Sequence, residues 1–86
     1  MLQSFNDKMG EAWQVLWRVP DPVELLREGF GVTELRPKNT RTSFDDPEFP
    51  AATVNLDVYE GQGSEGPTTV AMGEVSPGAF AVAVRQ

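Results

Sequence analysis

Residues 79–85 read AFAVAVR, a run in which alanines alternate with phenylalanine and valine and no charge appears before Arg85. Alternation with a period of two is typical of a β-strand, and here both faces of the strand are apolar. Strands with two apolar faces are normally covered on both sides. We expect one side to be covered by the core of the domain and the other by an N-terminal helix or by another subunit.

The segments that precede this run predict the rest of a small sheet. Residues 53–59 alternate between apolar and polar side chains, which is typical of a strand with one face in solvent. Residues 68–75 precede the turn-forming sequence Ser-Pro-Gly at 76–78, so they predict a hairpin with the last strand. Shorter elements are predicted as strands at 32–36 and 41–44, a turn at 37–39, and loops at 45–50 and 60–67.

Residues 4–19 predict an amphipathic helix. Apolar side chains recur there at the i, i+4, i+7 and i+8 spacing of one helical face. Pro20 ends this helix, because a proline restricts the residue before it to extended conformations. The apolar face is formed by Phe5, Met9, Ala12, Trp13, Leu16 and Trp17.

A second, shorter helix is predicted over residues 21–30. Asp21 suits the N-cap and Pro22 suits the first helical position. Gly29 or Gly31 can adopt the left-handed conformation that ends a helix.

Together these segments predict an α+β fold, with one or two N-terminal helices packed on a small, mainly antiparallel β-sheet or partly open barrel. Residues 1–86 are expected to form a single small domain, helical over 4–30 and β over 31–86. Domains of this size usually need disulfides, a structural metal or association to support a small core.

Histidine and cysteine are both absent from the 86 residues. These side chains supply most acid–base catalysis near neutral pH, reactive thiols and zinc sites. Glycine-rich phosphate-binding motifs are also missing, and the serines have no histidine base for a Ser-His-Asp triad. We therefore expect a protein that is not an enzyme, with no catalytic residue, cofactor, metal or small-molecule substrate. Association, with a protein partner or with itself, is the remaining source of additional stability.

The net charge is −6, and residues 45–74 hold seven acidic side chains and no basic one. An acidic chain is not expected to bind nucleic acid. Asp45, Asp46 and Glu48 form the densest cluster, but they lack the spacing of a calcium-binding loop, and an Asx-type turn before Pro47 explains the two aspartates. The segment is either a solvated face or a surface that occupies a basic patch on a target.

Two groups of apolar residues are candidates for a protein interface. Trp13 and Trp17 lie one turn apart on the predicted helix, where they serve either as core anchors or as a docking face. The large side chains of the last strand form the second group. The candidate interaction residues are therefore Trp13, Trp17, Phe80, Val82 and Val84.

The sequence carries no sign of membrane insertion. Residues 1–8 have neither the basic start nor the apolar run of a secretory signal, and no apolar stretch approaches the roughly 18–20 residues that span a bilayer. We expect a cytoplasmic or virion protein that does not associate with membranes.

The order of an N-terminal helix, short strands, the turn Phe44-Asp45-Asp46-Pro47-Glu48 and further strands resembles small tailed-phage head–tail attachment proteins. This resemblance carries over no functional residue. It implies a non-catalytic structural or interaction subunit of a larger assembly, most concretely a tailed-phage head–tail connector or capsid-associated protein. The alternative function is a small acidic regulator or inhibitor that binds a basic surface on a target protein.

Overall fold

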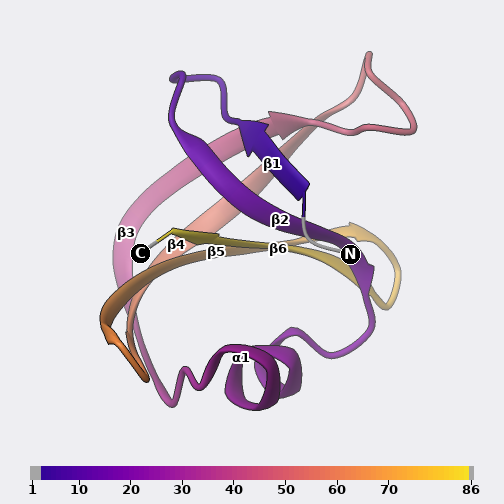
Figure 1. Cartoon of the computed structure of the whole chain (residues 1–86). Helices are drawn as coiled ribbons and strands as arrows, with labels where there is room; N and C mark the ends of the chain where they lie inside the picture. Colours follow the sequence, from indigo (N-terminus) through magenta and orange to yellow (C-terminus); the bar gives the residue numbers. More distant parts are fainter. Residues whose placement is uncertain (1–2, 86) are drawn as a thin grey trace.

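Within residues 3–85, which a computed structural model describes, six strands form one antiparallel sheet and a single helix packs beneath it (Figure 1). The elements are β1 (Gln3–Asn6), β2 (Ala12–Val19), α1 (Pro22–Phe30), β3 (Glu34–Asp45), β4 (Thr53–Gly63), β5 (Gly66–Ser76) and β6 (Ala79–Arg85). The strand order is β1-β2-β6-β5-β4-β3. The expected α+β fold with N-terminal helices is wrong, because residues 3–85 are mostly β and only the nine residues of α1 are helical among them.

The predicted helix at residues 4–19 is the β1–β2 hairpin instead. Gly10 adopts a left-handed φ of +87°, and its amide donates to the Asp7 carbonyl at 3.0 Å. Aspartate at the first position and glycine at the fourth are preferred in type I turns. Trp13 and Val15 of β2 belong to the same core cluster, and both residue types favour strands. The helical spacing in residues 4–19 was therefore misleading. The segment contains a tight turn, and the buried residues Trp13 and Val15 after it are two positions apart, as in a strand.

The predicted helix at residues 21–30 is confirmed as α1. Asp21 Oδ1 accepts from the Glu24 amide at 3.1 Å and caps the first turn. Gly31 ends the helix with a φ of +67°, which is favourable for glycine. Leu26 is buried and directs one side of the helix onto the sheet.

Three predicted strands, at 53–59, 68–75 and 79–85, are confirmed within β4, β5 and β6. The boundaries of other elements differ from the prediction. Residues 37–39 lie at an irregularity within the continuous strand β3, where Asn39 has a φ of +58°. The loop predicted at 60–67 is also wrong, because β4 and β5 remain paired up to Gly63 and Gly66.

The sheet carries apolar side chains on both faces, so the chain has two cores. The first core lies on the face turned away from α1, inside the curl of the sheet. The second lies between the sheet and α1. The first contains Trp13, Val15, Phe44, Leu56, Val58, Ala71, Ala81 and Ala83, and the second contains Leu26, Val32, Val70, Val82 and Val84.

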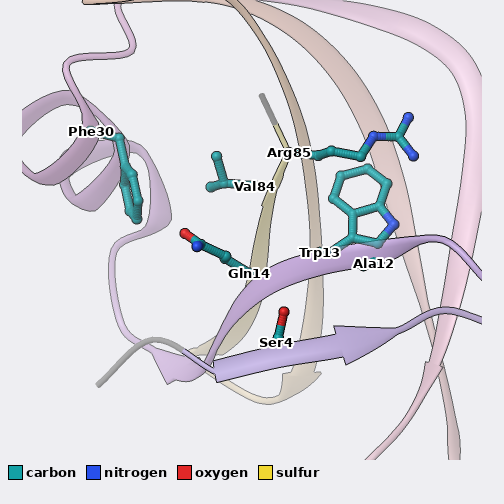
Figure 2. Close-up of a pocket in the computed structure, with 7 residues that line it drawn as sticks. All are labelled: Ser4, Ala12, Trp13, Gln14, Phe30, Val84 and Arg85. Carbon is teal, nitrogen blue, oxygen red and sulfur yellow. The ribbon is translucent and has the colours of Figure 1, made fainter.

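Strand β6 contributes to both cores. Its residues 81–84 are at most 4% exposed, with the alanines in the first core and the valines in the second. Figure 2 shows two successive residues of the strand on opposite sides, with Val84 directed towards Phe30 of α1 and Arg85 directed towards Trp13. The covering that the two apolar faces predict is therefore provided by this chain, with α1 in the place of a longer N-terminal helix.

The curled sheet is drawn together where the β1–β2 turn meets β3. The Lys8 amide donates to the Ser43 carbonyl at 2.9 Å. Next to it, Thr42 Oγ1 donates to Asp7 Oδ2 at 2.6 Å. These two hydrogen bonds join one edge of the sheet to the other and partly close it.

Asp7 is the centre of this closure, and it is only 7% exposed. Besides Thr42, its carboxylate accepts from Trp13 Nε1 at 3.0 Å and from the amides of Met9 and Glu11 at 3.0 and 2.9 Å. Burial raises the pKa of Asp7, but these hydrogen bonds together outweigh burial, so the pKa lies below its ordinary value. Asp7 therefore stays ionised at neutral pH with partners from its own chain.

Candidate functional site

The most unusual local geometry lies at the end of β2. The register between β2 and β6 shifts between Leu16 and Val19, and Arg18 there adopts a φ of +59°. A left-handed conformation in a residue other than glycine costs on the order of 1–3 kcal/mol, and such strain clusters at functional sites. Bulges also re-aim side chains. Here Arg18 Nη2 reaches Asp46 Oδ2 at 3.0 Å, at the base of the β3–β4 loop.

Asp46 organises the loop formed by residues 46–52. Its Oδ1 accepts from the Glu48 amide at 2.9 Å, which confirms the predicted Asx-type turn for Asp46. Asp45 makes no such turn, because it lies in β3 and pairs with Lys8. Three backbone hydrogen bonds, between residues 46 and 52, 49 and 46, and 52 and 49, cross the loop at 2.8 to 3.2 Å. Two prolines restrict the backbone further. The loop is therefore held in one conformation.

Asp46 is only 4% exposed, whereas its neighbours Asp45 and Glu48 are both exposed. Burial raises the pKa of Asp46, but hydrogen bonds from the Glu48 amide and from Arg18, with the Arg18 charge, outweigh burial and lower the pKa below its ordinary value. Asp46 is thus an ionised structural group, whereas Asp45 and Glu48 lie at the surface. The three acids do not form one uniform solvated cluster.

Phe49 projects from this loop with 61% of its surface exposed. Beside it, a groove of about 580 Å³ runs between the loop, the start of β4 and the end of β5. Arg18, Asp46, Phe49, Val54, Glu74 and Val75 are among the residues that line it. The loop and groove together present one exposed aromatic ring beside a mixed polar and apolar hollow.

Two buried donors have no acceptor among the described residues, namely Nη1 of Arg18, which lines this groove, and Nε1 of the preceding Trp17. Buried polar groups are paired in the great majority of cases, so each exception calls for an explanation. Both belong to the strained end of β2. The polar network around Arg18 is therefore incomplete within the described part of the chain.

The five candidate interaction residues are placed mainly inside the fold. Trp13, Val82 and Val84 are 3%, 0% and 4% exposed, so the chain itself covers them. Trp17 and Phe80 are partly buried. Trp17 makes edge contacts with Phe5 and Phe44, at ring-centre distances of 5.8 and 6.4 Å. Of the two roles expected for these residues, Trp13, Val82 and Val84 are therefore core residues, covered by α1 and by the curled sheet.

Most acidic side chains in residues 45–74 are neutralised locally. Five of the seven, in the described part of the chain, lie within 4 Å of a basic group. Lys8 pairs with Asp45, Arg18 with Asp46 and Glu48, Lys38 with Glu60, and Arg41 with Asp57. The bases come from other segments, which is why the sequence of residues 45–74 alone suggested a strongly acidic face.

A second hollow, of about 230 Å³, lies between the β1–β2 hairpin and the end of α1 (Figure 2). The Arg85 guanidinium carbon is 4.7 Å from the centre of the Trp13 ring, and Arg85 also pairs with Glu11. Ser4 and Gln14 supply the other polar groups of its lining. Residues 3–85 bring together no group of three acidic side chains that could hold a metal ion.

Comparison with protein-family models, with curated proteins and with solved structures gives no match for this chain. In the described residues, α1 is too short and too polar to cross a membrane.

Sequence reasoning missed Arg18 and Phe49. A left-handed arginine leaves no pattern in the sequence, because the bulge results from pairing with β6. Phe49 left a weak signal, since it is an aromatic residue close to two prolines in an otherwise polar loop. An apolar residue in such a loop is either turned inwards or exposed for contact, and only the structure separates these cases.

Proposed function

We propose that this protein is a non-catalytic interaction subunit of a larger assembly, and that the loop 46–52 with its groove is the docking surface. One observation carries the proposal: Phe49 is exposed on a loop that is anchored by the ion pair between the half-buried Arg18 and the buried Asp46. A partner would place an apolar pocket over the ring and polar groups in the groove.

The energetic reason lies in the rigidity of the loop. Binding a mobile loop requires that its side chains and backbone be ordered, at about 0.5–1.5 kcal/mol for each immobilised side chain. Here the internal hydrogen bonds of residues 46–52 have already ordered the backbone. Aromatic residues are also prominent among the few interface residues that dominate affinity. Phe49 therefore offers contact area at a low entropic cost.

The alternative, an acidic regulator that covers a basic surface, receives less support. Five of the seven acids in residues 45–74 already face basic groups of this chain. A partner's lysines and arginines would have to compete with these contacts. We propose that the subunit works in the cytoplasm or in a virion. The most specific version of this proposal, a tailed-phage virion, stays a prediction.

The proposal is tested by locating and then weakening the contact. A photo-crosslinking phenylalanine analogue is placed at position 49 in the chain expressed in its native cells, and at position 9 as the control, because Met9 is 82% exposed in the β1–β2 turn, outside the loop and its groove. The protein crosslinked at position 49 is identified and purified. Its affinity for the wild type, Phe49→Ala and Met9→Ala is measured by calorimetry, after thermal unfolding has shown that both variants fold.

We expect a crosslink from position 49 only, and a loss of about tenfold or more in affinity for Phe49→Ala. Met9→Ala should change the affinity by less than about twofold. Raising the salt concentration should have little effect, because the contact is mainly apolar. Equal crosslinking from both positions, or an unchanged affinity for Phe49→Ala, would refute the docking surface. A steep loss of affinity with salt would instead favour the acidic regulator.

A further inference from the structure

Another groove, of about 530 Å³ and separate from the two hollows described above, runs along one flank of α1. Its apolar lining comes from Val19 and Pro20, which connect β2 to the helix, and from Leu25 of the helix itself. The carboxylates of Asp21, Glu24 and Glu28 stand along the same groove. Figure 1 shows why this flank is open: α1 lies at the periphery, with the sheet on one side of it only.

The sequence of α1 produces this arrangement through its spacing. Asp21, Glu24, Leu25 and Glu28 follow one another at i, i+3, i+4 and i+7, so they share one flank of the helix. Leu26 points into the sheet and is 1% exposed, whereas Leu25 is only partly buried. The groove therefore combines an apolar floor with an acidic rim.

Within residues 3–85, none of the three carboxylates of this rim forms an ion pair. Ion pairs within residues 3–85 involve Lys8, Arg18, Lys38, Arg41 and Arg85, and none of these reaches the α1 groove. Asp21 accepts a hydrogen bond from the Glu24 amide but keeps its charge at the surface. Glu24 and Glu28 lie one helical turn apart and repel each other weakly. The rim thus differs from residues 45–74, where most acids are paired.

We propose that the α1 groove binds a basic amphipathic segment of another protein. An apolar side chain of that segment enters between Val19 and Leu25, and lysine or arginine side chains one helical turn apart meet Glu24 and Glu28. This binding mode is that of an amphipathic helix laid into an apolar groove. Charge complementarity selects the occupant, because the rim is acidic throughout.

The same charges argue against two other occupants. A second copy of this chain carries a net charge of −6, so the approach of two copies is opposed by repulsion. An anionic membrane surface would be repelled by Asp21, Glu24 and Glu28. The groove shares no lining residue with the groove beside Phe49, so the proposal stands independently of that docking surface.

The test uses a synthetic helical peptide of leucine and lysine, about fourteen residues or roughly four helical turns long. A second peptide with glutamate in place of every lysine keeps the apolar face and reverses the charge. Binding to the intact chain is followed by amide chemical shifts at low and at high salt. The variant Glu24→Gln/Glu28→Gln is compared with the matched control Glu34→Gln/Glu65→Gln. The control removes two other exposed carboxylates that lie outside every ion pair of residues 3–85.

We expect the lysine peptide to shift resonances of α1 and of Val19, and the glutamate peptide to leave them unchanged. Loss of two exposed ion pairs should weaken binding about fivefold in Glu24→Gln/Glu28→Gln. The control double variant and Phe49→Ala should bind the peptide as the wild type does. High salt should weaken wild-type binding towards the level of Glu24→Gln/Glu28→Gln.

Three outcomes would overturn the inference. Equal weakening in both double variants would mean attraction to the whole acidic surface, without a defined groove. Binding of the glutamate peptide at the same affinity would remove the role of the rim. Concentration-dependent dimers that Leu25→Ser abolishes, seen by sedimentation without peptide, would assign the groove to a second copy. Because the expected signals come from α1, failure here is distinguishable from failure at Phe49.

Discussion

Asp7 and Asp46 are both buried carboxylates with a lowered pKa, at 7% and 4% exposure, yet their surroundings differ. Asp7 accepts four hydrogen bonds, and all of them come from the β1–β2 turn, β2 and β3. Asp46 accepts a hydrogen bond from Arg18 Nη2. The backbone of this arginine is strained, and its Nη1 has no acceptor among the described residues.

The difference separates two uses of a buried charge. Around Asp7 the polar groups that close the sheet satisfy one another, so this network stabilises the closed sheet. Around Asp46 the network holds a loop but leaves Arg18 Nη1 without an acceptor among the described residues and the Arg18 backbone strained. Natural proteins keep such imperfections mainly where function requires them. We therefore infer that Asp7 closes the fold and that Asp46 serves the proposed presentation of Phe49.

The largest effect is expected for Asp7→Ala. This change leaves Trp13 Nε1, the Thr42 hydroxyl and two amides without their acceptor in the interior. Unpaired buried donors cost about 1–3 kcal/mol each, so we expect a loss of about 3 kcal/mol or more in the free energy of unfolding. Chemical denaturation measures it. Asp45→Ala is the control, because its ion pair with Lys8 is exposed and should be worth less than about 1 kcal/mol. Equal losses in the two variants would break the comparison.

A smaller effect is expected from pH. Above about pH 3.9, the ordinary pKa of aspartate in an unfolded chain, Asp7 is ionised in both states and its stabilisation is complete. As the pH falls further, the unfolded state binds the proton first, because the folded pKa is lowered, and the stabilisation is lost. We expect the free energy of unfolding to fall on acidification, and to fall less steeply in Asp7→Asn.

Thr42→Val offers a second measure of the same effect, because it removes one hydrogen bond to Asp7 and keeps the size of the side chain. Its acid dependence should lie between those of the wild type and Asp7→Asn. A residual slope should persist in all three proteins, since the pKa of Asp46 is lowered as well. Identical slopes in the wild type and both variants would contradict a role of Asp7 in acid lability.

The smallest change in stability is expected for Arg18→Gly/Asp46→Asn. Glycine adopts a φ near +59° without strain, and asparagine can still accept from the Glu48 amide. Relief of strain and loss of the ion pair oppose each other, so the denaturant midpoint should stay close to that of the wild type. The affinity for the partner crosslinked at position 49 should nevertheless fall, because the loop loses its anchor. A large loss of stability would place the Arg18–Asp46 pair with Asp7 as a purely structural element.

Local signals predicted some elements well. Asp21, Pro22 and Gly31 each carry their own capping chemistry, so α1 was predictable without knowledge of the rest of the chain. The alternation in residues 53–59 and 79–85 likewise specifies a strand on its own. For Asp46, the Asx turn follows from the residue type and the proline after it.

Other features depended on contacts that are distant in sequence. The segment 4–19 fits both a helical spacing and a hairpin, and pairing of β2 with β6 decides between them. The hydrogen bond from Thr42 to Asp7 joins residues that are 35 positions apart. The candidate site depends on the same kind of contact, because Arg18 reaches Asp46 across 28 positions. Patterns within a short window contain no information about such contacts.

The place of β6 in the middle of the sheet has a consequence for how the chain is made. Gln14 of β2 pairs with Val84, seventy residues later, so β2 has no neighbour on that side until β6 has left the ribosome. During that interval the core around Trp13 and Val15 lacks Ala81 and Ala83 of β6. Contacts so distant in sequence slow folding, and exposed apolar strands invite aggregation meanwhile. The nascent chain is therefore most vulnerable before β6 is made, and its native core assembles only after synthesis has passed that strand.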